Sequence, residues 1–190
     1  MLYGARYEKT FSSRREELAF QRSLAEELLR WALRSERGLD LSALRRERTP
    51  DGKPFFSDCP VQFSLSHCRG MVCCGLSDSS LGVDVESPRP FSRRLVERVC
   101  TQEELAWLEA QPDRERGFLV LWTLKESVMK LSGKGIAYGF QQAAFTFPEG
   151  RLVFREPEVK LSQFELPGGW IVSAASREES FSQLRMVDLA

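Results

Sequence analysis

Two acidic clusters contain the residues best suited to chemistry. The first is Gly82-Val83-Asp84-Val85-Glu86, in which apolar and acidic residues alternate. Because successive side chains of an extended strand point to opposite faces, Asp84 and Glu86 are expected to project the same way, with Val83 and Val85 packed behind them. Taken alone, such a pattern is usually the solvated face of a half-buried sheet.

The second cluster lies between Trp122 and Lys130, a segment predicted to be helical. Glu126 and Lys130 are four residues apart, so a helix would place them on one face. Such a pair is usually a surface ion pair worth ~0.3–0.5 kcal/mol. Three carboxylates and a lysine together, however, are suited to holding a hard divalent cation against phosphate oxygens. Lys125 lies about 100° around the helix from Glu126, so it is expected to face either a cleft or solvent.

Two upstream segments add polar groups to this set. Phe63-Ser64-Leu65-Ser66-His67 is predicted to be a short strand that leads into the only histidine of the chain. A lone histidine is more often a structural residue than a ligand. Gly52-Lys53-Pro54 is predicted to form a rigid turn, for which an ordinary polar turn is the simpler explanation.

Hydrophobic periodicity predicts the elements that must position these residues. Helices are predicted at Arg15–Leu33, Arg93–Val99, Gln102–Ala110 and Glu115–Leu131. Strands are predicted at Val61–Leu65, Met71–Leu76, Leu81–Val85, Ala143–Phe147, Leu152–Phe154, Phe164–Leu166 and Trp170–Ala175. Pro88-Arg89-Pro90 breaks the chain near its midpoint and predicts an N-terminal lobe of residues 1–88 and a C-terminal lobe of residues 89–190. Each half runs from helix to strands, which favours an α+β fold with a weak internal duplication.

Composition favours a folded protein that does not act on nucleic acid. The 190 residues are 42% hydrophobic, and the 27 Lys and Arg balance the 27 Asp and Glu, so no global positive field is expected. The five cysteines include no Cys-x-x-Cys pair, which favours reduced thiols in a cytosol. The charged start of the chain and its short apolar runs predict a cytoplasmic protein with no membrane partner.

Four of the segments described above resemble, in their order and spacing, motifs of the 4′-phosphopantetheinyl transferases. They are Gly52-Lys53-Pro54, Phe63–His67, Gly82–Glu86 and Trp122–Lys130. Together with Gly133-Lys134-Gly135 they span residues 52–135, and they look most like the larger, monomeric, surfactin-synthetase-activating type. The resemblance implies a pseudo-dimer of two similar α+β lobes with coenzyme A in the cleft between them. It also implies transfer of the phosphopantetheine arm of coenzyme A to a serine of a carrier protein, with release of adenosine 3′,5′-bisphosphate.

The resemblance also implies a metal site and a pyrophosphate site. Asp84, Glu86 and Glu126 would be the three oxygen ligands of a Mg²⁺ ion, completed by pyrophosphate oxygens and water. Lys130 and His67 are expected to bind phosphate oxygens. Ser66 is also expected to bind coenzyme A.

The adenosine end of coenzyme A has its own candidates. Lys53 resembles the residue of the family that contacts it. For the 3′-phosphate the candidates are Arg14, Arg15 and Arg22, although a solvated helix face explains these arginines equally well.

Thr101-Gln102-Glu103-Glu104 resembles a further family segment, with Cys100 in place of the usual aromatic residue. It also fits a helix N-cap followed by acids. Glu104 is therefore a candidate second acid near the metal, with Glu103 as the alternative in register. The group that removes the serine proton is left open between Glu126, Glu104 acting through a water, and neither.

Two other functions compete with the transferase. A metal-dependent nuclease or phosphodiesterase also uses clustered carboxylates and a lysine, but it usually needs a basic groove. A carrier-binding module without catalysis would not need all three carboxylates together with His67 and Lys130.

The carrier protein is expected to dock on the segment after Pro88, because carrier proteins are acidic around the modified serine. The candidate residues combine cations with apolar side chains: Arg89, Phe91, Arg93, Arg94, Leu95 and Arg98. The alternative is that Phe91 and Leu95 pack inside the protein and the arginines are solvated.

Overall fold

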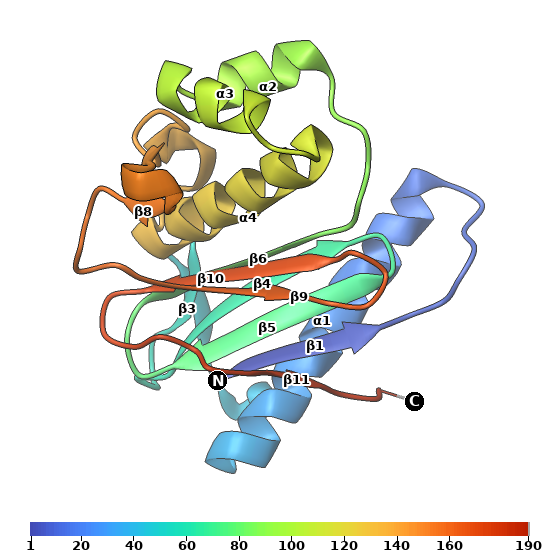
Figure 1. The fold of residues 1–190 in the computed structure, drawn as a ribbon. Coiled ribbons are helices and arrows are strands. Elements are labelled where there is room, and N and C mark those ends of the chain that lie inside the picture. The colour runs from blue at the N-terminus through green and yellow to red at the C-terminus, as the bar shows by residue number, and fades with distance from the viewer. Residues whose placement is uncertain (190) are drawn as a thin grey trace.

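Two β-sheets lie face to face in the middle of the molecule, in a computed structural model that describes residues 1–189 (Figure 1). The first sheet has the strand order β11-β1-β5-β4, and the second has the order β6-β10-β9. The first contains β1 (Leu2–Arg6), β4 (Gln62–Cys68), β5 (Met71–Ser77) and β11 (Leu184–Met186). The second contains β6 (Leu81–Glu86), β9 (Lys160–Glu165) and β10 (Ile171–Ser176). Two small hairpins pair β2 (Arg46–Arg48) with β3 (Pro54–Phe56), and β7 (Phe145–Thr146) with β8 (Val153–Phe154).

Helices cover the outer faces of both sheets, so the layers run helix, sheet, sheet, helix. The α-helices are α1 (Arg14–Arg37), α2 (Arg93–Val99), α3 (Gln102–Glu109) and α4 (Arg114–Ser132). Short 3₁₀ turns are η1 (Leu41–Ala43), η2 (Gly135–Tyr138) and η3 (Pro148–Gly150). One apolar cluster lies between α1 and the first sheet, a second between the two sheets, and a third between the second sheet and α4 with its neighbours. The sequence prediction of a mixed α+β fold is confirmed.

Helix α1 follows the predicted apolar stripe and is capped at both ends. The Ser13 hydroxyl accepts a hydrogen bond from the Glu16 N–H, and Gly38 ends the helix with a left-handed φ of 63°. Leu24, Leu28 and the other apolar residues of the stripe are buried against the first sheet. The helix extends one turn beyond the predicted end at Leu33.

Helix α4 packs closely on β6, and a glycine makes this approach possible. A Cβ atom at Gly82 would lie 2.0 Å from the Ser127 carbonyl oxygen and 2.4 Å from the Leu131 nitrogen. Only a residue without a side chain fits there. The same strand turns its apolar residues Val83 and Val85 into the cluster between the sheets. Asp84 and Glu86 therefore face the other way, as the alternation predicted.

Three predicted strands have different bounds in the structure. The predicted strand Ala143–Phe147 is reduced to the two residues of β7, because the N–H groups of Phe145 and Phe147 bind the carboxylates of Glu104 and Glu103. The predicted strand Leu152–Phe154 is reduced to the two residues of β8. Strand β9 begins at Lys160, four residues before the predicted start at Phe164. Exposed polar side chains along this edge strand hid it from a search for apolar runs.

Strands β1 and β11 lie near opposite ends of the chain and were not predicted. They pair in parallel, with Leu2 opposite Leu184. The sheets also do not follow the predicted division after residue 88. Strand β6 precedes that point but belongs to the second sheet, and β11 follows it but belongs to the first. The two lobes of residues 1–88 and 89–190 stay a prediction.

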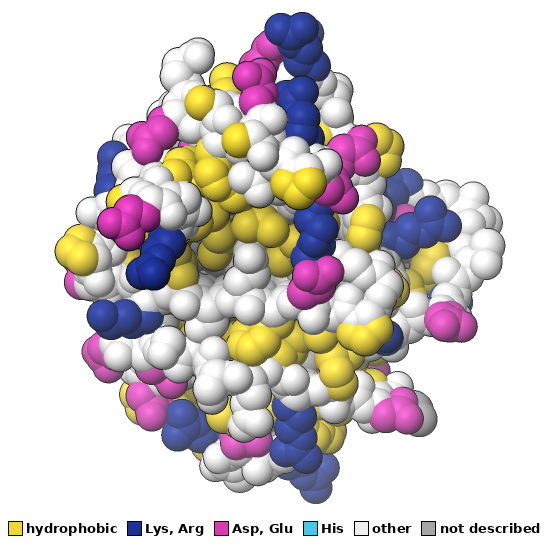
Figure 2. Space-filling view, viewed as in Figure 1, with side chains coloured by type: hydrophobic (Ala, Val, Ile, Leu, Met, Phe, Trp, Pro, Cys, Tyr) yellow, Lys and Arg dark blue, Asp and Glu magenta, His cyan; other side chains and the backbone are white. Residues whose placement is uncertain are grey.

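Charged side chains of both signs are interspersed on the face shown in Figure 2, with apolar side chains in a hollow near its centre. This face has no broad basic surface of the kind that binds a phosphate backbone. Within residues 1–189, none of the helices combines the length and the apolar character that crossing a bilayer requires.

Candidate active site

An ion pair between β6 and α4 forms the centre of the candidate site. The Lys130 ammonium lies 2.7 Å from Asp84 Oδ1, donates to the Ser66 hydroxyl at 2.9 Å and donates to the Val83 carbonyl at 2.9 Å. Ser66 in turn donates to Asp84 Oδ1 at 2.8 Å. The structure thus brings together Asp84, Lys130 and Ser66, three of the residues that the sequence nominated.

The second carboxylate oxygen of Asp84 is buried and has no hydrogen-bond partner among the described residues. A buried acceptor without a hydrogen-bond partner lowers the free energy of unfolding by about 1–3 kcal/mol. It is therefore a ready position for a cation or a proton donor.

Glu86 and Glu126 lie in the same electrostatic environment. Burial raises the pKa of Glu126 to about 7, and the negative charges of Asp84 and Glu86 add to this effect. Burial also raises the pKa of Glu86, again with a contribution from Asp84, although Arg89 lies 3.3 Å from the Glu86 carboxylate. The three predicted metal ligands thus repel one another. As placed, however, residues 1–189 contain no group of three or more His, Cys, Asp or Glu side chains arranged to hold a metal ion.

The raised pKa of Glu126, caused mainly by burial, predicts how the stability of the metal-free protein depends on pH. The folded state raises the pKa of Glu126 from 4.5 to about 7 and so binds the proton more tightly than the unfolded state. Stability is therefore expected to fall as pH rises from about 4.5 to about 7, by about 2 kcal/mol after allowance for solvent screening. In chelator, Glu126→Gln should be more stable than the wild type at pH 8 but not at pH 4. Urea unfolding at both values tests this, with the exposed Glu109→Gln as the control. An equal effect at both pH values would contradict the prediction.

His67 lies among positive charges. Burial lowers its pKa, and Lys130, Arg22 and Arg14 lower it further. The structure therefore brings two of the three arginine candidates into the electrostatic surroundings of His67. Arg15 is exposed on α1 and is not among the charges that lower the pKa of His67.

Lys53 does not point its ammonium group into solvent. The ammonium donates to the carbonyls of Leu81 at 3.0 Å and Leu131 at 3.3 Å, and burial lowers its pKa. A cavity of about 260 Å³ lies beside it, lined also by Ser64, Lys130 and Gly133. Two of the three N–H groups of Lys53 are thus used within the protein.

A comparison with known families identifies the chain. A family model described as the 4′-phosphopantetheinyl transferase superfamily matches residues 80–175, slightly more than half of the sequence. The matched segment contains Asp84, Glu86, Glu126 and Lys130. The chain belongs to this superfamily.

Curated members of the superfamily are similar to this chain over part of their length. The 4′-phosphopantetheinyl transferase psf-1 of Bacillus pumilus is 32% identical over 139 residues, which cover 71% of this chain and 60% of the relative. The 4′-phosphopantetheinyl transferase Sfp of Bacillus subtilis is 32% identical over 117 residues, covering 60% of this chain and 52% of the relative. The chain therefore spans between about half and three fifths of the length of these relatives. The resemblance to this type of transferase is confirmed.

Glu104 forms a buried ion pair with Lys125. Its carboxylate is fully buried and lies 2.8 Å from the ammonium of Lys125, which is also fully buried. It also accepts hydrogen bonds from the N–H groups of Thr101 at 2.7 Å and Phe145 at 2.9 Å. Lys125 donates in addition to the Phe140 carbonyl at 2.9 Å.

These contacts give the pair a structural role. Glu104 completes a capping box with Thr101, which confirms the predicted N-cap. The prediction that Lys125 faces a cleft or solvent is wrong, because its ammonium binds a carboxylate on the neighbouring helix. The same contacts use both carboxylate oxygens of Glu104 within the protein, and its role as a second acid near the metal stays a prediction.

Loss of the Glu104 charge is expected to destabilise the folded protein. Glu104→Gln leaves the Lys125 ammonium buried without a counter-charge, which should lower the free energy of unfolding by about 3–5 kcal/mol. Glu103→Gln is the matched control, because Glu103 is the exposed neighbour on the same helical turn. The free energy of unfolding in urea measures both. Equal stability of the two variants would show that the buried pair contributes nothing.

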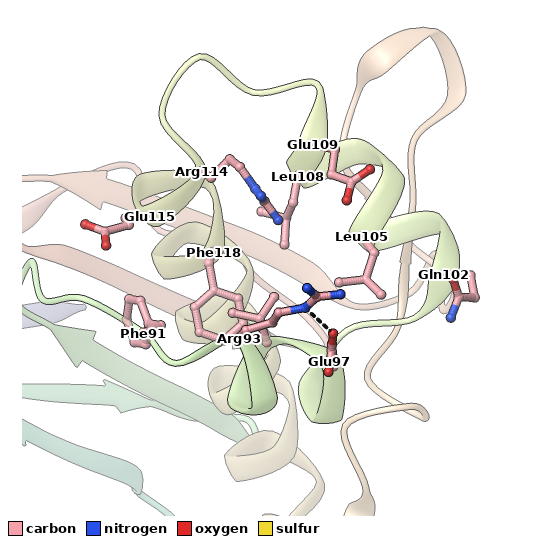
Figure 3. Close-up of a pocket in the computed structure, with 11 residues that line it drawn as sticks. Phe91, Arg93, Glu97, Gln102, Leu105, Leu108, Glu109, Arg114, Glu115 and Phe118 are labelled. Atoms are coloured by element: carbon pink, nitrogen blue, oxygen red, sulfur yellow. Dashed lines mark hydrogen bonds and ion pairs between the residues drawn. The ribbon is translucent and has the colours of Figure 1, made fainter.

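The predicted docking segment borders a pocket of about 730 Å³ between α2, α3 and the start of α4 (Figure 3). The Arg93 guanidinium lies 2.7 Å from Glu97, so its charge is neutralised locally. Phe91 packs edge-to-face on Phe118 with ring centroids 4.5 Å apart. The structure therefore favours the alternative for Phe91. Docking of an acidic carrier here stays a prediction that depends on Arg94 and Arg98, which are exposed.

Proposed function

We propose that this chain transfers the 4′-phosphopantetheine arm of coenzyme A to a serine hydroxyl of an acyl or peptidyl carrier protein. The main support is the group formed by Asp84, Lys130 and Ser66, with Glu86 and Glu126 beside it, inside the segment that matches the family model. In this reaction the serine oxygen attacks the phosphorus that bears the pantetheine arm. The bond from that phosphorus to the bridging oxygen breaks, and adenosine 3′,5′-bisphosphate leaves.

In this proposal the Lys130 ammonium neutralises charge on the pyrophosphate, and the His67 imidazole, whose pKa is lowered, contributes an N–H donor. Lys130 and His67 bind phosphate oxygens, whose negative charge increases as the bridging bond breaks. Arg14 and Arg22, whose charges act on His67, hold the 3′-phosphate. Their shared positive field supports binding of a ligand with several phosphates.

Glu126 is the proposed general base. In the metal-free protein the pKa of Glu126 is about 7, so this carboxylate can accept a proton near neutral pH, and a bound Mg²⁺ would lower that pKa and keep the carboxylate ionised. We do not assign this role to Glu104, because both of its oxygens are occupied within the protein.

We further propose that Asp84, Glu86 and Glu126 hold a Mg²⁺ ion. Their oxygen donors suit this ion, the free Asp84 oxygen lacks a partner, and their mutual repulsion favours a cation between them. When bound, the ion would neutralise charge on the pyrophosphate oxygens.

The proposed architecture is two similar lobes with coenzyme A in the cleft between them, in a monomer. Strand β5 and strand β10 support it, because each is an interior strand of its sheet and each sheet carries one long helix on its outer face.

Incubation with coenzyme A, Mg²⁺ and a panel of apo carrier proteins tests the proposed reaction. Intact mass spectrometry of the carriers should show addition of phosphopantetheine, and a carrier with its serine replaced by alanine should stay unmodified. If no carrier in the panel is modified, but nucleic acid or a phosphodiester is cleaved, the competing hydrolase function is correct instead.

Coenzyme A is expected to raise the melting temperature, because a ligand that binds only the folded state stabilises it. Dephospho-coenzyme A should raise it less, since it lacks the 3′-phosphate assigned to Arg14 and Arg22. Thermal unfolding with each ligand measures the difference, and Arg22→Gln should reduce it. Equal shifts for the two ligands would remove these arginines from the site.

A further inference from the structure

Strand β6 has one edge that is not paired with another strand. Its partner on one side is β10, and on the other side lies β4, the end strand of the first sheet. Because the backbone groups of a strand alternate in direction, the groups of Leu81, Val83 and Val85 point away from β10 and towards β4. All three residues are buried, so these N–H and C=O groups need partners.

Four side chains supply the partners along this edge. The Ser64 hydroxyl accepts a hydrogen bond from the Val83 N–H at 2.9 Å, and the Ser66 hydroxyl accepts one from the Val85 N–H at 3.2 Å. The carbonyls are bound by lysines. Lys53 donates to Leu81 O at 3.0 Å, and Lys130 donates to Val83 O at 2.9 Å. Ammonium and hydroxyl groups thus alternate where a neighbouring strand would otherwise supply backbone groups.

Lys53 also connects this edge to α4. Its ammonium donates to the carbonyl of Leu131, the residue after Lys130, at 3.3 Å. The carbons of its side chain pass Gly133, the residue that ends α4. The start of β6 and the end of α4 are therefore joined by one half-buried cation, close to the point where Gly82 allows the two elements to approach.

We propose that Lys53 and Ser64 are positioning residues for the transfer reaction. They hold β6 and the end of α4 in the relative position at which Asp84 contacts Lys130. Through this position they affect kcat without contacting the substrate. In this proposal Lys53 does not bind the adenosine end of coenzyme A through its side chain, in contrast to the role that the sequence suggested. The inference depends on the proposed function for its kinetic test but not for its structural test.

The kinetic test separates positioning from binding. Lys53→Met removes the ammonium and keeps most of the side chain, and Ser64→Ala removes one hydroxyl. Each should lower kcat by about tenfold to a hundredfold, the usual penalty for misplaced reacting groups. KM for coenzyme A, and its Kd from calorimetry, should stay within about threefold of the wild type. Lys53→Arg keeps the donors and should recover most of kcat. The exposed Lys134→Met is the matched control.

The structural test does not require turnover. Hydrogen exchange at the Val83 amide should accelerate in Ser64→Ala, which removes its acceptor, and stay unchanged in Lys134→Met. If the wild type modifies no carrier, the proposed function fails, while faster exchange still supports the role of the β6 edge. A tenfold rise in the Kd of coenzyme A with unchanged kcat in Lys53→Met would overturn the inference. Unchanged exchange and unchanged kcat in Ser64→Ala would overturn it as well.

Discussion

Replacing Asp84 by asparagine is expected to lower carrier modification by about a thousandfold while the protein stays folded. One oxygen of Asp84 orients Lys130 and Ser66, and the other is buried without a partner. Asparagine has almost the same shape, but it removes the negative charge and replaces one of the two carboxylate oxygens with an amide NH₂ group. The site would then lose both its attraction for a divalent cation and the ion pair that orients Lys130.

Intact-mass kinetics with a modifiable carrier measure this loss, and circular dichroism checks the fold. Asp188→Asn is the control, because Asp188 is exposed near the end of the described chain. Excess chelator should lower wild-type activity to a similar level. Activity within tenfold of the wild type in Asp84→Asn would show that this carboxylate is not part of the catalytic group.

Replacing Gly82 by alanine should have the largest effect on stability. The new methyl group would meet backbone atoms of α4, the closest at 2.0 Å, and a helix backbone cannot rotate away as a side chain can. We expect a loss of more than about 4 kcal/mol, or a failure to fold. Any folded protein would have α4 displaced from β6, and hence Lys130 displaced from Asp84.

Gly75→Ala is the matched control for this prediction. A Cβ there would lie 2.6 Å from side-chain atoms of Leu81 and Val83, which can shift. Gly75→Ala should therefore lower the free energy of unfolding by about 1–3 kcal/mol. Chemical unfolding of both variants gives the comparison. Equal costs for the two would mean that α4 is free to move away from β6.

Elements that are defined by a local pattern of residues could be predicted from the sequence alone. The alternation in residues 82–86 and the apolar stripe of α1 each depend on one short stretch, and both predictions are confirmed. The meeting of Asp84 with Lys130 was predictable only in outline, because it requires β6 and α4 to pack together. Spacing within each segment gives the face of a side chain but not its partner.

The environments of Lys53, Lys125 and Glu104 depend on contacts between distant segments. Helical periodicity gives the direction of Lys125, but the buried carboxylate that it meets is on another helix. Lys53 lies in a turn that resembles a ligand contact, while its ammonium binds carbonyls of β6 and α4. The sequence predicts Ser64 only as part of a strand. Its spacing of two from Ser66 was the one available sign that both hydroxyls face the same neighbour.

The parallel pairing of β1 with β11 has a consequence for synthesis of the chain. Strand β1 leaves the ribosome long before residues 184–186 are synthesised. Until then one edge of β1 lacks its final partner, and an unpaired edge is a template for contact with other chains. Contacts between residues this distant in sequence also form slowly. Completion of the first sheet is therefore expected to follow translation, and the nascent protein should be most prone to aggregate in the interval before β11 is added.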